Sequence, residues 1–94
     1  MPFSRHSGYT FSAASVQRNA PRCSGVYGLS NATGWLFVGI ADDIQAALLA
    51  HLLEFNTVLR SLAATGFTYE ECVPAVRGGR QSRLITELAP ACNS

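Results

Sequence analysis

The sequence lacks lysine altogether, and charged residues of any kind make up only 14% of its 94 residues. All seven basic residues are arginine, and the formal net charge is +1. Such a small net charge excludes a whole-molecule attraction to nucleic acid or to a membrane surface. Arginine makes bidentate contacts to carboxylate and to phosphate, so local ion pairs and a local phosphate site are both open to these residues.

The chain also has no paired cysteine motif and no long apolar run, and its first residues do not predict a signal peptide. Its three cysteines, Cys23, Cys72 and Cys92, are widely spaced, which favours reduced thiols over a disulfide framework. The first six residues do not have the charged-then-apolar layout of a signal peptide. The longest apolar-rich run, 46–53, is interrupted by His51 and is far too short to span a bilayer. We therefore expect a cytoplasmic protein that does not bind a membrane.

Hydrophobic residues make up 48% of the sequence, enough for the core of one small domain over residues 1–94. Two short apolar runs lie on either side of an Asn/Thr/Gly-rich segment, a pattern that predicts a β-hairpin over 25–40. Each strand carries a glycine near an aromatic residue, in Gly25-Val26-Tyr27 and in Phe37-Val38-Gly39. Glycine weakens a strand unless a bulge or a close backbone approach needs the space. The two pairs therefore predict a site on one face of the hairpin.

Local signals predict helices and one more strand around this hairpin. Ser12 is a suitable N-cap for a first helix, and Asp42 and Asp43 suit the start of the longest one. The predicted helices span 13–19, 43–56 and 81–88, and Pro90 terminates the last of them. A further helix is predicted from residue 56 or 57 to 63, with Gly66 after it. A strand over 67–73 and a loop over 77–80 complete the predicted elements. This α-β-β-α-α-β-α order predicts an α+β fold in which helices flank a three-stranded antiparallel sheet.

The long predicted helix is apolar on almost every side. Ile44, Leu48 and Leu52 belong to a stripe of residues spaced by three or four that predicts a core-facing surface. Most other positions up to residue 53 are apolar too, which is typical of a helix that is buried on several sides. Two interpretations follow. The helix is either plain core or the centre of an interface, such as a homodimer that pairs through helix 44–55.

Taken in order, these motifs resemble the GIY-YIG nuclease family. Gly25-Val26-Tyr27 is similar to the first motif, Phe37-Val38-Gly39 to the second, and His51 closes the long-helix motif. The Leu84-Ile85 pair, followed by Pro90 and Asn93, is similar to the closing motif. The resemblance covers residues 11–93 and leaves 1–10 as an N-terminal arm.

This resemblance implies a metal-dependent endonuclease, and it assigns a role to single positions. Tyr27 matches the first tyrosine, which orients or activates the attacking water, and Phe37 stands for the second. Ala47 occupies the position of the arginine that steadies phosphate charge. Gln81 occupies the position of the glutamate that holds the divalent metal. His51 matches, although a histidine on an apolar helix is also interpreted as a core or interface residue.

These departures predict a remnant site at Tyr27, Phe37, His51 and Gln81. Removing one charge-stabilising donor costs about 10²–10³ in rate, and a neutral amide is a poor anchor for magnesium. The leading hypothesis is an impaired nuclease fold that acts as a nucleic-acid-binding or protein-interaction module. The resemblance alone identifies no certain cofactor.

Two alternatives stay open. The first is a divergent but active DNA endonuclease that uses Mg²⁺ or Mn²⁺. In it, Arg80 or Arg83 would supply the positive charge and Glu70 or Glu71 the metal ligand. The second is the homo-oligomer described above.

Arg77, Arg80 and Arg83 form the densest group of positive charge in the sequence. With Gly78 and Gly79 they are candidates for a phosphate site, and hence for weak and salt-dependent binding of DNA. The other interpretation is a solvated loop whose arginines pair with Glu87 or with the chain terminus.

Overall fold

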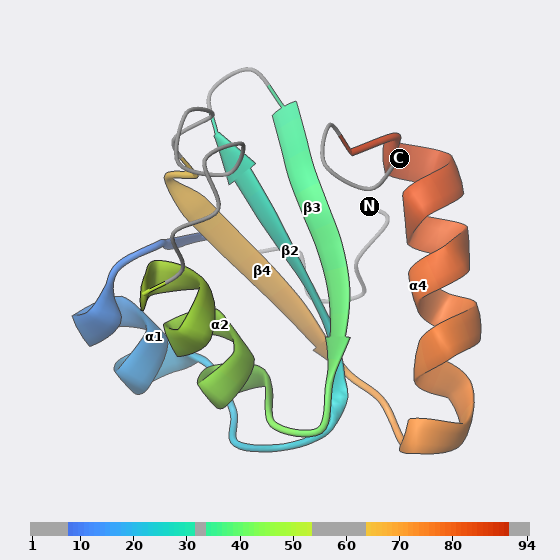
Figure 1. Ribbon diagram of the computed structural model, residues 1–94, viewed down its shortest axis with the longest axis horizontal. Helices are drawn as coiled ribbons and strands as arrows, with labels where there is room; N and C mark the ends of the chain where they lie inside the picture. The colour runs from blue at the N-terminus through green and yellow to red at the C-terminus, as the bar shows by residue number, and fades with distance from the viewer. Residues whose placement is uncertain (1–7, 32–33, 54–63, 91–94) are drawn as a thin grey trace.

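The structure is a computed structural model that describes residues 8–31, 34–53 and 64–90. Along the chain the elements follow the order β-α-β-β-α-β-α around one sheet (Figure 1). They are β1 (Tyr9–Thr10), α1 (Ala13–Asn19), β2 (Gly25–Asn31), β3 (Gly34–Ala41), α2 (Ile44–Leu53), β4 (Gly66–Glu71) and α4 (Pro74–Leu88).

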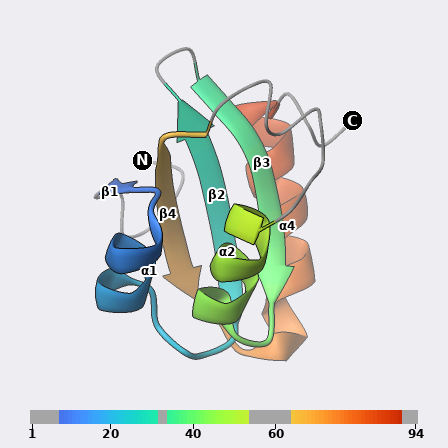
Figure 2. The same cartoon turned by 60° about the vertical axis from the view of Figure 1, so that its left-hand side comes forward.

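The strands form one antiparallel sheet in the order β1-β4-β2-β3. Helices α1 and α2 lie together on one face, and α4 covers the other, as Figure 2 shows from the side. The predicted hairpin is confirmed as β2 and β3, with a register irregularity between Leu29 and Ser30. Because side chains alternate along a strand, β2 and β3 contribute to both faces.

Two hydrophobic clusters fill the space on either side of the sheet. On the α1/α2 face, the fully buried members include Leu29, Ile44 and Leu48, as the helical stripe predicts. On the α4 face, the smaller cluster consists of Val26, Val38 and Leu84. Neighbouring strand residues thus face opposite helices, and this alternation decides which side chains can meet.

The helix starts follow the capping signals in the sequence. The Ser12 hydroxyl accepts a hydrogen bond from the Ser15 N–H at 3.3 Å, which confirms Ser12 as the N-cap of α1. Asp43 accepts from the Ala46 N–H at 3.0 Å at the start of α2. Each acceptor satisfies a backbone donor that the first helical turn leaves free.

The prediction of three strands is incomplete, because the described sheet has four. The additional strand, β1, consists of two residues from the expected N-terminal arm, and Tyr9 pairs with Phe67 of β4. The Tyr9 ring also stacks on Tyr69 with centroids 6.0 Å apart. A two-residue strand is too short for an alternation pattern, so only these contacts with a distant strand reveal it.

The prediction of a loop over 77–80 is wrong. Residues 74–88 form one helix, α4, with Pro74 in its first turn and with Gly78 and Gly79 inside it. Two glycines in a helix interior cost about 1 kcal/mol each relative to alanine. Contacts of α4 with segments that are distant in sequence offset this cost. The helix ends at Leu88, where Ala89 adopts a left-handed conformation before Pro90, so the predicted stop is confirmed.

The remaining boundaries differ slightly from the prediction. The third predicted strand is β4, which begins at Gly66 and ends at Glu71 instead of spanning 67–73. Gly66 is therefore the first residue of a strand and not the cap of a helix. Helix α2 is described from Ile44 to Leu53, and the predicted second helix lies outside the described residues.

Candidate functional site

Gly39 opens a space on the α2 side of the hairpin that two aromatic rings fill. In the β2–β3 register Gly39 lies opposite Tyr27. A Cβ atom at Gly39 would lie 2.6 Å from the Tyr27 ring and 2.7 Å from that of Phe37, closer than packed carbon atoms can approach. The second motif glycine is therefore required by the position of the two rings.

Gly25 has a comparable steric role at the start of β2. A Cβ atom there would overlap the Glu70 carbonyl oxygen and would lie 2.8 Å from the Ile44 side chain. This glycine lets β4 and the first turn of α2 approach the same point of the strand. The two motif glycines, Gly25 and Gly39, are thus explained by close approach, as the sequence pattern indicates.

The rings of Tyr27, Phe37 and His51 form a cluster between the hairpin and α2. The Tyr27 hydroxyl and His51 Nε2 are 2.7 Å apart, a hydrogen bond whose donor depends on the histidine tautomer. The centroid distances are 5.5 Å for Tyr27–His51, 5.2 Å for Phe37–His51 and 6.1 Å for Tyr27–Phe37. Three of the four predicted remnant positions are therefore brought together, and Tyr27 is only 4% exposed.

Ala47 lies one turn before His51 on α2, where the resemblance implies an arginine. It is half-buried and packs against the hydrophobic cluster on the α1/α2 face. Because the Ala47 side chain is only a methyl group, it brings no positive charge to the ring cluster.

Gln81 lies on α4, which packs on the other face of the sheet. Its side-chain Nε2 donates a hydrogen bond to the backbone carbonyl oxygen of Val38 at 3.1 Å. Val38 is the middle residue of Phe37-Val38-Gly39, so Gln81 contacts the second motif through its backbone. An amide N–H that donates to a carbonyl cannot serve as a metal ligand through the same atom.

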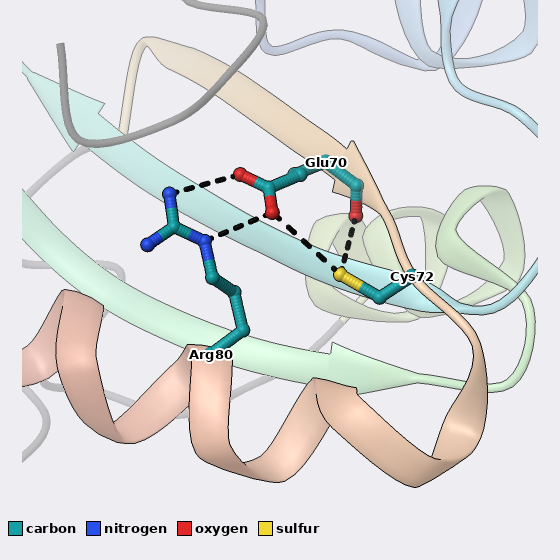
Figure 3. A network of polar contacts seen from close by, with 3 residues as sticks. All are labelled: Glu70, Cys72 and Arg80. Carbon is teal, nitrogen blue, oxygen red and sulfur yellow. Dashed lines mark hydrogen bonds and ion pairs between the residues drawn. The ribbon is translucent and has the colours of Figure 1, made fainter.

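Two of the three arginines in the predicted cluster are engaged inside the molecule. Arg80 donates to both Glu70 carboxylate oxygens, at 2.9 and 3.0 Å (Figure 3). This hydrogen bond to Glu70 raises the pKa of Arg80. Arg77 donates to the Ala41 carbonyl oxygen at 3.0 Å and pairs with Asp42.

Arg83 is the member of this cluster whose residue is exposed, on the surface of α4 beside Ser82 and Glu87. The interpretation of a solvated loop paired with Glu87 or the chain terminus is wrong for Arg77 and Arg80, which lie on a helix and pair with Asp42 and Glu70. Asp42 and Glu70 are 35 and 10 residues away in sequence. No local pattern links them to α4.

The two glutamates considered as replacement metal ligands have other partners. Glu70 lies opposite Val26 and faces α4, whereas Tyr27 and Tyr69 face the other side of the sheet. Glu71, at the exposed end of β4, accepts a hydrogen bond from the Cys23 thiol at 3.1 Å. Within the described residues, no group of three or more His, Cys, Asp and Glu side chains is arranged to hold a metal ion. Gln81, at the position where the resemblance implies the metal-holding glutamate, offers a neutral amide and no carboxylate, so this residue does not fit a divalent cation.

Both described cysteines are free thiols beside carboxylates. Burial, and then the Glu71 carboxylate, raise the pKa of Cys23 to about 11. Burial, and then the charge of Glu70, also raise the pKa of Cys72, whose Sγ lies 3.8 Å from a Glu70 carboxylate oxygen (Figure 3). A thiol in such surroundings is a weak nucleophile, because the reactive thiolate is disfavoured.

Helix α2 is mostly turned toward the core. Leu49 and Leu52 are half-buried and pack against the cluster on the α1/α2 face, while Ala46 and Ala50 are exposed. This packing explains the apolar composition of the described part of α2 within a single chain. The homodimer through helix 44–55 stays a prediction.

The arrangement matches solved structures of a GIY-YIG nuclease domain. The chain is similar to the GIY-YIG N-terminal endonuclease domain of UvrC from Thermotoga maritima, in two tyrosine-to-phenylalanine point mutants that are each bound to a catalytic divalent cation. The first match has a TM-score of 0.72 and 19% identity, covering 84% of this chain and 96% of that domain. The second has a TM-score of 0.71 and 20% identity, covering 84% and 94%.

This likeness shows that the chain has the GIY-YIG fold, as its motifs predict. No protein-family model matches the sequence, and no curated protein matches it. Among the described residues, none of the helices has the length and apolar character needed to cross a membrane.

Proposed function

We propose that this protein is a GIY-YIG-fold binding module that does not cleave phosphodiester bonds at a useful rate. The observation that carries the proposal is the hydrogen bond from Gln81 Nε2 to the Val38 carbonyl oxygen. At the position where the resemblance implies a metal-binding carboxylate, the chain has a neutral amide that is already engaged. Magnesium sites depend on carboxylate charge, so this position does not anchor the cation.

The similar UvrC domain indicates which departures matter most. Its tyrosine-to-phenylalanine mutants are bound to their catalytic divalent cation. By analogy, Phe37 without a hydroxyl does not by itself abolish a metal site in this fold. The substitutions at Ala47 and Gln81 carry more weight, because they remove the phosphate-facing charge and the metal-facing charge. Losing both costs several kcal/mol of transition-state stabilisation.

The alternative of an active enzyme requires Arg80 or Arg83 and a carboxylate from Glu70 or Glu71. Arg80 and Glu70 bind one another on the α4 face, and Glu71 accepts from Cys23. Recruiting Arg80 and Glu70 would therefore break a half-buried ion pair, which is costly when either partner is left alone. This favours binding over catalysis.

A protein partner fits the surface better than DNA. Arg77 and Arg80 contact Asp42 and Glu70, so the predicted cluster offers little charge for phosphate. Exposed apolar side chains lie at the start of α4, where Val73 and Val76 are 63% and 54% exposed. Weak DNA binding, if measured, will weaken as salt rises, but with a shallow slope because few phosphates can be contacted.

A cleavage assay tests the proposal directly. Purified protein is incubated with branched, single-stranded and duplex DNA in Mg²⁺ or Mn²⁺, beside the Tyr27→Phe variant prepared in the same way. We expect no turnover that differs between the two proteins. Metal-dependent cleavage by the natural sequence that disappears in Tyr27→Phe refutes the proposal, since a contaminating nuclease would be present in both preparations.

A further inference from the structure

The contact between Gln81 and Val38 suggests more than the loss of a metal site. We infer that Gln81 is a positioning residue that holds α4 against β3 through a contact that needs no cation. The inference rests on the proposed function for the role of position 81. It adds that the stability of the fold depends on the Gln81 side chain, which melting experiments can measure without any assay of cleavage.

Gln81 belongs to a set of side chains on one side of α4. Arg77, Gln81 and Leu84 are spaced by four and three residues, so they lie on the same face of the helix. Arg77 donates to the Ala41 carbonyl oxygen, Gln81 to that of Val38, and Leu84 is completely buried. Arg80, next to Gln81, binds Glu70 of β4. These contacts link α4 to the middle and the C-terminal end of β3 and to β4, and they hold two interior glycines in helical conformation.

The chemistry of position 81 explains why glutamine, and not glutamate, suits this contact. The Val38 carbonyl is an acceptor, and Gln81 supplies the donor at 3.1 Å. A carboxylate of the same size offers only acceptor oxygens, so it would place negative charge against the carbonyl oxygen. A proton or a cation between the two oxygens would remove that repulsion. Carboxylate and carbonyl oxygens are ligands that Mg²⁺ and Mn²⁺ prefer.

Gln81→Glu is therefore expected to convert a cation-independent contact into a cation-dependent one. In EDTA the variant should melt about 5 °C below the natural sequence, because the carbonyl loses its donor and faces a like charge. Millimolar Mn²⁺ should restore part of this difference. The natural sequence should melt at the same temperature in EDTA and in Mn²⁺.

Two variants control this experiment. Ser82→Glu adds the same charge one residue further along α4, at an exposed position, and should show neither the loss nor the response to Mn²⁺. Gln81→Leu keeps the size of the side chain but removes the donor, so it should melt lower in both solutions.

Three outcomes would overturn the inference. They are a melting temperature of the natural sequence that rises in Mn²⁺, a Gln81→Glu variant as stable as the natural sequence in EDTA, and an equal response to Mn²⁺ in Ser82→Glu. If Gln81→Glu does not fold in either solution, NMR on the natural sequence decides. Selective Mn²⁺ broadening of the amide signals of residues 38 and 81 refutes the inference, and its absence supports it.

The outcomes for the two proposals are distinguishable. DNA cleavage by the natural sequence would refute the proposed function, whatever the melting temperatures are. A natural sequence that neither cleaves DNA nor depends on Gln81 for stability would leave the proposed function in place and refute this inference alone.

Discussion

The two faces of the sheet differ in the kind of contact that holds their helices. On the α1/α2 face the contacts are apolar, and the motif residues Tyr27, Phe37 and His51 pack as a cluster of rings. On the α4 face a small apolar cluster is surrounded by polar contacts from Arg77, Arg80 and Gln81. The ring cluster that the sequence predicts as a remnant site thus lies on one face, while Arg77 and Arg80 of α4 form ion pairs within the fold on the other.

The two faces therefore contain residues under different constraints, some limited by the space they fill and others by their charge or hydrogen bonds. Packing residues such as Gly39 are constrained by volume, because interiors are close-packed. Residue 81 is constrained only by what its side chain can donate or accept. The packing of the ring cluster and the hydrogen bonding of residue 81 are therefore separate requirements on the sequence.

The largest expected effect comes from disturbing the ring cluster. Gly39→Val places branched carbons where the Tyr27 and Phe37 rings lie, and such overpacking costs about 3 kcal/mol. Denaturant unfolding followed by fluorescence should show this loss. Ile40→Val, at the next and exposed position, is the matched control and should change stability by less than about 0.5 kcal/mol. A fully stable Gly39→Val variant would mean that the rings are not held against this glycine.

A smaller loss is expected from breaking the main polar contact of α4. Arg80→Met removes the ion pair with Glu70, whose side chains are only 23% and 15% exposed. We expect a loss of about 2 kcal/mol, less than for a fully buried pair because water still reaches both groups.

A double-mutant cycle with Glu70→Met isolates the interaction between the two side chains. The double variant should be more stable than the sum of the two single losses predicts, since it leaves no unpaired charge. Strict additivity would show that the two residues act independently.

The smallest change in stability is expected from a substitution that strengthens α4. Gly78→Ala meets no heavy atom within 4 Å of the added Cβ, and alanine has the higher helix propensity. We expect a gain of about 0.5–1 kcal/mol in chemical denaturation, partly through the unfolded state. A loss of stability would instead mean that residues 77–80 form the loop that the sequence pattern predicts and are not helical in solution.

Features that depend on near neighbours could be predicted well. The hairpin, the Ser12 cap, the start of α2 at Ile44 and the stop before Pro90 all have signals within a few residues. The ring cluster of Tyr27, Phe37 and His51 was predicted as a set from the resemblance, and the fold brings these residues together. The helical state of Gly78 and Gly79 could not be predicted, because local propensity favours a loop there and the contacts that override it come from β3 and β4.

The order of most elements, the GIY-YIG-like motifs and the unusual residues Ala47 and Gln81 can all be recognised in the sequence. This is possible because periodicity, capping and motif spacing are properties of neighbouring positions. The contacts that those residues make depend on how the chain folds in three dimensions. Gln81 meets the Val38 carbonyl across 43 residues and Arg77 meets Asp42 across 35. Such pairings are set by strand register and by the face on which a helix packs, which no local pattern contains.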